Sequence, residues 1–181
     1  MSTHRRSTPE ILEALKARLT AATWQPPGGG PAEQAFEQVA LYDLTDLESA
    51  FRDLLASKRR VAFLVPTGET FAEAARGRMA LYTRRLTVSL LISDRVHGKR
   101  LEALYGSATT PGAEGLKELA LTVVCGQLFE PPAGVLCKPL AAVPLQIEDN
   151  TRALPGRAAI ELQLELTGGV VSAPVLPAPT L

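Results

Sequence analysis

Few side chains of this protein have the types and spacing that catalysis requires. Histidine occurs twice, and only His97 lies near other reactive groups, Ser93 and Asp94. A serine, an aspartate and a histidine form a hydrolytic triad when they converge in space, which neighbours at the end of one strand rarely do. We therefore expect no catalytic residues. A small hydrolase that uses Asp94 and His97 stays open as an alternative, as does one that uses the carboxylates Glu69 and Glu73.

Signatures of nucleotide binding, nucleophilic catalysis and metal binding are missing from the sequence. Residues 66–70 lack the second glycine and the Lys-Ser/Thr pair of a phosphate loop, and no Gly-x-Ser-x-Gly motif occurs. The two cysteines, Cys125 and Cys137, fit no metal-ligand spacing. Cys125 lies in an apolar run, which predicts a free, buried thiol of a reducing cytosol. We expect no cofactor and no metal.

Two basic groups follow one another near the middle of the sequence. The first is Arg84 with Arg85, and the second is Arg95, His97, Lys99 and Arg100. Two interpretations stay open: a solvated strand edge and loop, or an interface that meets acidic residues of a neighbour or the phosphates of DNA. The 19 basic residues balance the 19 acidic residues, which argues against binding of nucleic acid over much of the surface.

The clearest structural signal is the alternation of apolar and polar residues in segment 159–166. Its apolar residues point into a core, because the side chains of a strand alternate between two faces. The polar residues Glu161, Gln163 and Glu165 then face water or a partner. A sheet that is open on one side in this way indicates an antiparallel or mixed architecture.

The remaining elements follow from apolar periodicity and from the positions of proline and glycine. Residues 8–21 are predicted as an amphipathic helix with Thr8 as its cap, and residues 24–31 as a surface loop. Further helices are predicted at 46–58, 114–128 and, as a single turn, 100–105. Strands are predicted at 38–42, 61–65, 79–93, 136–140, 143–148 and 158–166. Of these, 79–93 is expected to be the longest, Pro66 to stop the strand at 61–65 before a loop, and Gly168 to end the last strand. The order α-β-α-β-β-α-β-β-β predicts an α+β fold, with helices mainly on one face of a mixed, mostly antiparallel sheet.

Length and terminal composition predict one domain with a tail. A chain of 181 residues can form a single core, and we expect this domain to cover residues 1–168. Residues 169–181 are predicted as an extended, proline-rich tail. No apolar run is long enough to cross a bilayer, and the N-terminus has no signal-sequence pattern. The sequence thus predicts a soluble, cytoplasmic protein without a membrane partner.

Several segments, taken in order, carry a resemblance to a known family. Residues 11–15 look like its N-terminal helix, residues 85–91 like its central strand, and residues 115–128 like a helix that breaks at a glycine, here Gly126. Pro139-Leu140 and the strands at 145–148 and 158–166 look like its closing hairpin. Over residues 9–166 the pattern resembles tail-terminator-like, tail-completion proteins of long-tailed bacteriophages, in particular a small tail protein of Mu-like phages and prophages.

The resemblance implies a structural virion protein and no enzyme. Such proteins form a hexameric ring that caps the tail tube and joins it to the neck, in the virion tail after assembly in the host cytoplasm. The implied partners are further copies of the chain, the tail tube protein and a neck or head–tail connector protein, with non-specific contact to passing DNA. Six spheres about 40 Å across would leave a lumen of about 40 Å.

On this interpretation, the two basic groups and the polar residues of the alternating strand are candidate interface or lumen residues. They are Arg84, Arg85, Arg95, His97, Lys99, Arg100, Glu161, Gln163 and Glu165. Sheet edges and the proline-rich tail are further candidate contacts between copies. Two alternatives stay open: a neck or head–tail joining protein, and a monomeric cytosolic adaptor that binds one partner through the open face of the sheet.

Overall fold

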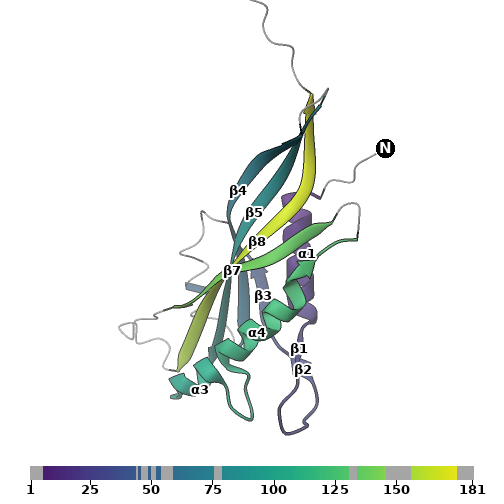
Figure 1. Ribbon diagram of the computed structural model, residues 1–181. Coiled ribbons are helices and arrows are strands. Elements are labelled where there is room, and N and C mark those ends of the chain that lie inside the picture. Colours follow the sequence, from purple (N-terminus) through teal and green to yellow (C-terminus); the bar gives the residue numbers. More distant parts are fainter. Residues whose placement is uncertain are drawn as a thin grey trace, which may run out of the picture.

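The computed structural model describes residues 6–43, 45, 49, 52–53, 59–75, 79–130, 134–145 and 156–174. It has the predicted α+β architecture: a six-stranded sheet of order β3-β4-β5-β8-β7-β6, antiparallel at every described pairing except the parallel β3–β4 pair (Figure 1). The predicted helix at 46–58 lies mostly outside the described residues. In chain order the elements are α1 (Thr8–Ala21), β1 (Thr23–Trp24), β2 (Glu33–Gln34), β3 (Gln38–Leu41), β4 (Val61–Ala75), β5 (Met79–Arg95), α3 (Arg100–Tyr105), α4 (Gly112–Val124), β6 (Gly126–Gln127), β7 (Val135–Leu145) and β8 (Arg157–Pro174).

Helix α1 begins with a capping box. The hydroxyl of Ser7 accepts a hydrogen bond from the backbone N–H of Glu10, whose carboxylate accepts from the N–H of Ser7 at 2.6 Å. The boundaries 8–21 are confirmed, but the prediction that Thr8 caps the helix is wrong, because Ser7 and Glu10 satisfy each other's free N–H groups. The hydroxyl of Thr8 instead donates to the carboxylate of Glu69 in β4, at 3.3 Å.

The main core lies between the helices and one face of the sheet. Leu15 of α1, Leu116 of α4, Leu90 of β5 and Leu164 of β8 are all fully buried in it. Burying one such side chain contributes about 1.5–3 kcal/mol to folding. Because elements from both halves of the sequence share this core, α1 and α4 hold the sheet together from one side.

Strand β4 continues through Pro66, where the sequence predicted that it would stop. It pairs with β5 from Val61 to Ala75, with a register shift between Pro66 and Gly68. On its other side β3 pairs with it only as far as Leu64, so Pro66 lies on an edge, where its missing N–H leaves no ladder bond unmade. The predicted loop after Pro66 is therefore wrong: residues 67–75 belong to the strand.

Strand β8 continues through Gly168 in the same way. Its 18 residues make it longer than β5, with 17, so the prediction of β5 as the longest strand is wrong. A Cβ on Gly168 would lie 2.5 Å from the carbonyl oxygen of Gly134, so this glycine permits a close approach of the segment before β7 and does not end the strand. Beyond Gly168, β8 pairs with β5 alone, as far as Pro174 opposite Met79.

Two further boundaries differ from the prediction. Gly126 has a φ of 96°, a left-handed conformation that ends helix α4 at Val124, and the chain continues as β6. Strand β7 joins the two segments predicted after it into one strand that runs to Leu145, with a register shift between Pro139 and Ala141. A bulge thus replaces the predicted break.

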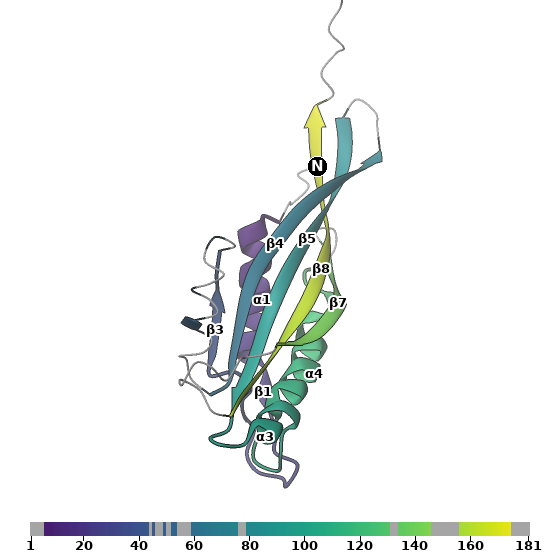
Figure 2. The same ribbon diagram turned by 90° about the vertical axis from the view of Figure 1, so that its left-hand side faces the viewer.

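The ends of β4, β5 and β8 project beyond the helices as an arm. We call residues 70–75 of β4, 79–83 of β5 and 169–174 of β8 the arm, because it extends past the contact between Thr8 of α1 and Glu69 and past the last β7–β8 pair, Val135 opposite Gly168 (Figures 1 and 2). Within the described residues, neither outer edge of the arm has a partner strand. Helix α3 and the turn before α4 lie at the opposite end of the sheet, which we call the base (Figure 2).

Candidate functional site

Ser93, Asp94 and His97 do not converge on one site. Ser93 and Asp94 are neighbours in β5, so their side chains point to opposite faces of the sheet. The hydroxyl of Ser93 donates to the carbonyl oxygen of Ala158 at 2.9 Å and accepts from the guanidinium of Arg157 at 2.8 Å. His97 is exposed in the turn after the strand. The three side chains therefore do not form a triad.

Asp94 is instead the centre of a buried network at the base. Its fully buried carboxylate accepts hydrogen bonds from the hydroxyl of Thr110, from Nε of Arg59 at 3.3 Å and from the backbone N–H of Arg95 at 2.7 Å. Thr110 belongs to the turn between α3 and α4, and Arg59 precedes β4. One carboxylate thus links three segments, which is a structural role.

Arg157 lies close to this network with only 2% of its surface exposed. Burial, and then the positive charge of Arg95, lower the pKa of Arg157 to about 10, against the opposing effect of Asp94. It still carries its charge at neutral pH. The sequence did not single out Arg157, although its place at the start of the alternating strand was visible.

The two neighbouring arginines Arg84 and Arg85 lie on opposite faces of β5. Arg84 is 7% exposed; it donates to Thr8 Oγ1 at 3.2 Å and to the carbonyl oxygen of Arg6, and it pairs with Glu69 at 3.3 Å. It therefore fastens the start of α1 to the sheet. Arg85 is exposed on the opposite face and is the one of the pair that a partner can reach.

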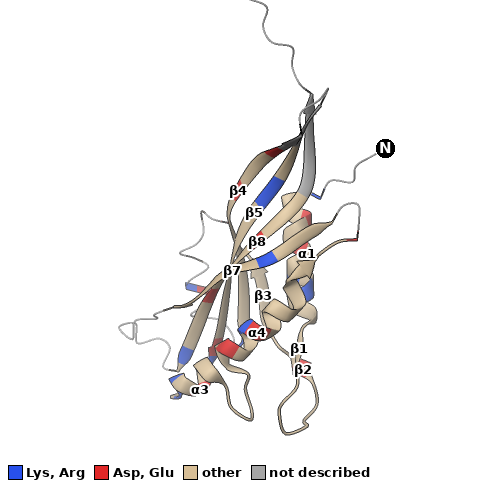
Figure 3. Cartoon of the chain, viewed as in Figure 1, with Lys and Arg blue, Asp and Glu red and all other residues tan. Residues whose placement is uncertain are grey.

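The second basic group lies around the turn between β5 and α3, at the base. His97, Lys99 and Arg100 are exposed and Arg95 is half-buried, and Lys99 pairs with Glu102 at 2.7 Å. Figure 3 shows cationic and anionic residues interspersed along the described elements and not gathered on one of them.

Glu161, Gln163 and Glu165 lie on the face of β8 away from the helices, as predicted, and each is half-buried. Glu161 accepts from the hydroxyl of Ser89 at 2.7 Å and from Nε2 of Gln163 at 3.5 Å. Glu165 accepts from the hydroxyl of Thr167 at 3.3 Å. The polar side chains on this face thus form hydrogen bonds with neighbouring residues of β5 and β8. Their role in an interface stays a prediction.

The sheet face away from the helices is not open along its whole length. A second apolar cluster occupies it near the base, where Phe63 is fully buried and its ring lies 5.1 Å from that of Tyr42. The hydroxyl of Tyr42 donates to the carboxylate of Asp53 at 2.8 Å. Burial, reinforced by Asp53, raises the pKa of Tyr42 to about 12. On this face the apolar cluster near the base is buried, whereas the polar residues of β8 are half-buried and Val143 of β7 is 47% exposed.

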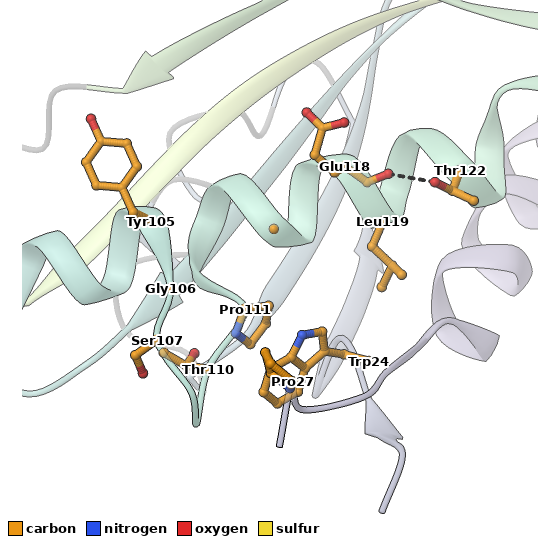
Figure 4. Close-up of a pocket in the computed structure, with 11 residues that line it drawn as sticks. Trp24, Pro27, Tyr105, Gly106, Ser107, Thr110, Pro111, Glu118, Leu119 and Thr122 are labelled. Atoms are coloured by element: carbon orange, nitrogen blue, oxygen red, sulfur yellow. Dashed lines mark hydrogen bonds between the residues drawn. The ribbon is translucent and has the colours of Figure 1, made fainter. Parts of the chain in front are cut away.

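A groove of about 430 Å³ lies at the base, and we call it the groove (Figure 4). It lies between the β1–β2 hairpin, the α3–α4 turn and the outer side of α4. Trp24, Pro27, Pro111 and Leu119 provide its apolar walls. Its remaining lining is polar or small: Tyr105, Gly106, Ser107, Thr110, Gly115, Glu118 and Thr122.

The hairpin that forms one wall of the groove was predicted as a surface loop. Thr23 and Trp24 pair with Gln34 and Glu33, so proline and glycine residues connect two short strands. Trp24 is half-buried and packs against the main core. The available signal in the sequence was the tryptophan itself, two residues before Pro26. A tryptophan has a large apolar side chain that is stabilised by packing against other residues, even when it lies in a loop.

The two cysteines are free and lie near each other, Cys125 half-buried and Cys137 only 2% exposed. Burial raises the pKa of both thiols, that of Cys137 to about 12, which makes them poor nucleophiles. Among the described residues, no three His, Cys, Asp or Glu side chains gather in a way that could hold a metal ion.

Comparison with known proteins adds no relative: no family model and no curated protein matches the chain. Within the part of the chain that the structure describes, no helix has the length and apolar character needed to span a membrane. The arm, the groove and the polar face of β8 are therefore the features from which a function has to be argued.

Proposed function

We propose that this chain is a structural protein of a bacteriophage virion, a tail terminator whose copies form a ring that caps the tail tube and joins it to the neck. The arm is the single observation that carries the proposal. It projects beyond the helices, and within the described residues both of its outer edges lack a partner strand. Unpaired strand edges are templates for contact with another chain.

A projecting arm suits repeated contacts between identical copies. When the arm of one copy lies against the next copy, two different surfaces meet, and such heterologous contacts close into a ring if the rotation between copies allows it. The molecule is elongated, because β8 with its 18 residues is about 55–60 Å long. The molecule is thus not the sphere of about 40 Å that its length predicts. In a ring, an elongated copy can contact its neighbours over a longer surface than a sphere can.

Apolar side chains are exposed at the two ends of the molecule, and the pair on α3 supports the same proposal. Phe71 is 55% exposed on the arm, and Leu101 and Tyr105 are 72% and 68% exposed on α3 at the base. Leu101 and Tyr105 lie one helical turn apart on α3, and contiguous exposed apolar side chains mark interaction surfaces, whereas a single one such as Phe71 is normal.

Light scattering tests the proposal, applied to the full chain alone and after mixing with tail tubes. We expect a hexamer, or a monomer that assembles only on tube ends. Phe71→Lys places a charge on the arm and should abolish assembly, whereas Leu140→Lys changes an equally exposed side chain (55%) of β7 outside the arm and should leave it intact. A monomer that ignores tubes would contradict the proposal and favour a cytosolic adaptor.

A further inference from the structure

We propose that the groove binds the proline-rich segment 174–179 of a second copy of this chain. The inference rests on the proposed self-association and says which segment of one copy meets which surface of the next. Segment 174–179 reads Pro-Val-Leu-Pro-Ala-Pro, in which two prolines are separated by two apolar residues. Such segments adopt the polyproline II conformation, which has no internal hydrogen bonds and costs little entropy to order.

The lining of the groove fits a proline-rich strand. Proline-rich strands bind in grooves with aromatic and apolar walls, and here Trp24, Pro27, Pro111 and Leu119 form the walls. A proline-rich strand presents carbonyl oxygens without N–H donors to pair them, and a tryptophan N–H is a pure donor. The indole N–H of Trp24 donates to none of the described residues.

Charge and size agree with this occupant. Residues 172–181 carry no charged side chain. The groove contains one charged residue, Glu118, which is exposed and shares Lys117, at 3.1 Å, with Glu114. Its volume of about 430 Å³ lies within the usual range of pockets that hold small ligands, about 300–1,000 Å³, and thus accommodates a few residues of a peptide and not a folded domain.

The segment cannot reach the groove of its own molecule. The groove-lining residue Thr110 bonds to Asp94, which lies opposite Ala158 in the sheet. Pro174 lies at the other end of β8, about 50 Å away at about 3.3 Å per residue. The residues that follow Pro174 in the sequence, 175–181, extend at most about 25 Å. Binding therefore joins the arm end of one copy to the base of another.

The chain contains a built-in probe for this contact, because Trp24 is its single tryptophan. The host for the test is the full chain with Pro177→Ala and Pro179→Ala, whose own segment no longer competes. A synthetic peptide of residues 172–181 is titrated into it while the emission of Trp24 is recorded. We expect a saturable blue shift, and no shift with a peptide in which Pro174, Pro177 and Pro179 are alanine.

A pair of matched variants locates the binding site. Thr122 and Thr20 are both exposed helical threonines whose hydroxyls donate to the carbonyl four residues earlier, at 3.0 and 2.8 Å, but only Thr122 lines the groove. We expect Thr122→Arg to weaken peptide binding about tenfold or more, a loss of about 1.4 kcal/mol. Thr20→Arg should leave it unchanged. Far-UV circular dichroism confirms that both variants fold.

The outcomes separate this inference from the proposed ring. If the peptide causes no saturable shift, or binds Thr122→Arg as well as Thr20→Arg, the groove does not bind this segment, even where the chain still assembles on tail tubes. If the peptide binds in the groove but the chain never assembles on tubes, the proposed function fails and the binding site stands.

Discussion

At the scale of single residues, the charged side chains of this protein serve mainly to join segments. Arg84 connects the start of α1 to the sheet through Thr8 and Glu69. Asp94 joins β5 to the α3–α4 turn through the hydroxyl of Thr110. Burying a charge is costly unless hydrogen bonds and opposite charges compensate it, and both residues have such partners. Their contribution is therefore to stability.

The role of Asp94 can be tested by removing its side chain. Asp94→Ala leaves the buried hydroxyl of Thr110 and the N–H of Arg95 without their acceptor. We expect the free energy of unfolding to fall by about 3 kcal/mol, measured by urea denaturation. Asp43→Ala removes the same side chain from an exposed position and should change it by no more than about 0.5 kcal/mol. Equal effects of the two substitutions would show that the network contributes nothing.

At the scale of elements, the turn that joins α3 to α4 is set by two glycines. Gly106 and Gly112 have φ angles of 84° and 67°, and their backbones approach each other so closely that a Cβ on Gly112 would lie 2.2 Å from the nitrogen of Gly106. This close approach places Ser107 and Thr110 beside the groove and brings Thr110 to Asp94. The geometry of the groove thus depends on a backbone contact.

Two glycine substitutions test how much the turn between α3 and α4 depends on glycine at position 106. Gly106→Ala adds a Cβ that would lie 2.4 Å from the carbonyl oxygen of Pro111, whereas Gly98→Ala, at a φ of 70°, meets no atom within 4 Å. Gly98→Ala incurs the roughly 1–2 kcal/mol of a left-handed non-glycine residue. Gly106, at φ 84° and ψ 179°, lies in a region used almost only by glycine, where another residue costs roughly 1–3 kcal/mol. We expect Gly106→Ala to lower the melting temperature clearly more than Gly98→Ala. Similar melting temperatures would mean that the turn relaxes without cost.

At the scale of the whole molecule, one core connects elements that are far apart in the sequence. Residues of α1, β4, β5, α4, β7 and β8 all contribute buried side chains to it, and Trp24 of the groove packs against it. Cooperative unfolding is the expected consequence, because no element can leave without exposing the apolar surface of several others.

A substitution in α1 tests this cooperativity. Leu15→Ala creates a cavity at a fully buried position and should cost about 2–5 kcal/mol. We expect the urea transition to shift equally when it is followed by far-UV circular dichroism and by the fluorescence of Trp24. Leu101→Ala, at a side chain that is 72% exposed on α3, should shift neither by more than about 0.5 kcal/mol. Separate transitions for the two probes would contradict a single shared core.

Local patterns predicted much of the fold. The leucine spacing after Pro9 predicted α1, because amphipathicity acts within a few residues. The capping box of Ser7 and Glu10 is equally local, although the prediction placed the cap at Thr8. The alternation in 159–166 identified the faces of β8 for the same reason. Gly126, which ends α4, was also visible in the sequence, although the predicted helix ran past it. The α+β class follows from the order of such elements.

The ends of the strands could not be predicted in this way. Pro66 and Gly168 look like breaks. Pro66 is tolerated because β4 has no neighbour on one side at this position. Gly168 pairs with Arg84 and Val135, and its missing Cβ allows the close approach of Gly134. The groove escaped prediction for a related reason. Its walls come from residues around 24, 106 and 119, and only packing brings them together.

The sequence by itself determined the local elements and which face of each is apolar, because these depend on neighbours within one or two turns of the chain. The tertiary structure alone decided which strand edges stay unpaired, that Asp94 and Arg84 join segments, and that Trp24 faces α4 across a groove. Such features depend on contacts between residues far apart in the sequence, and their energies are set by burial and by the partners available in the fold.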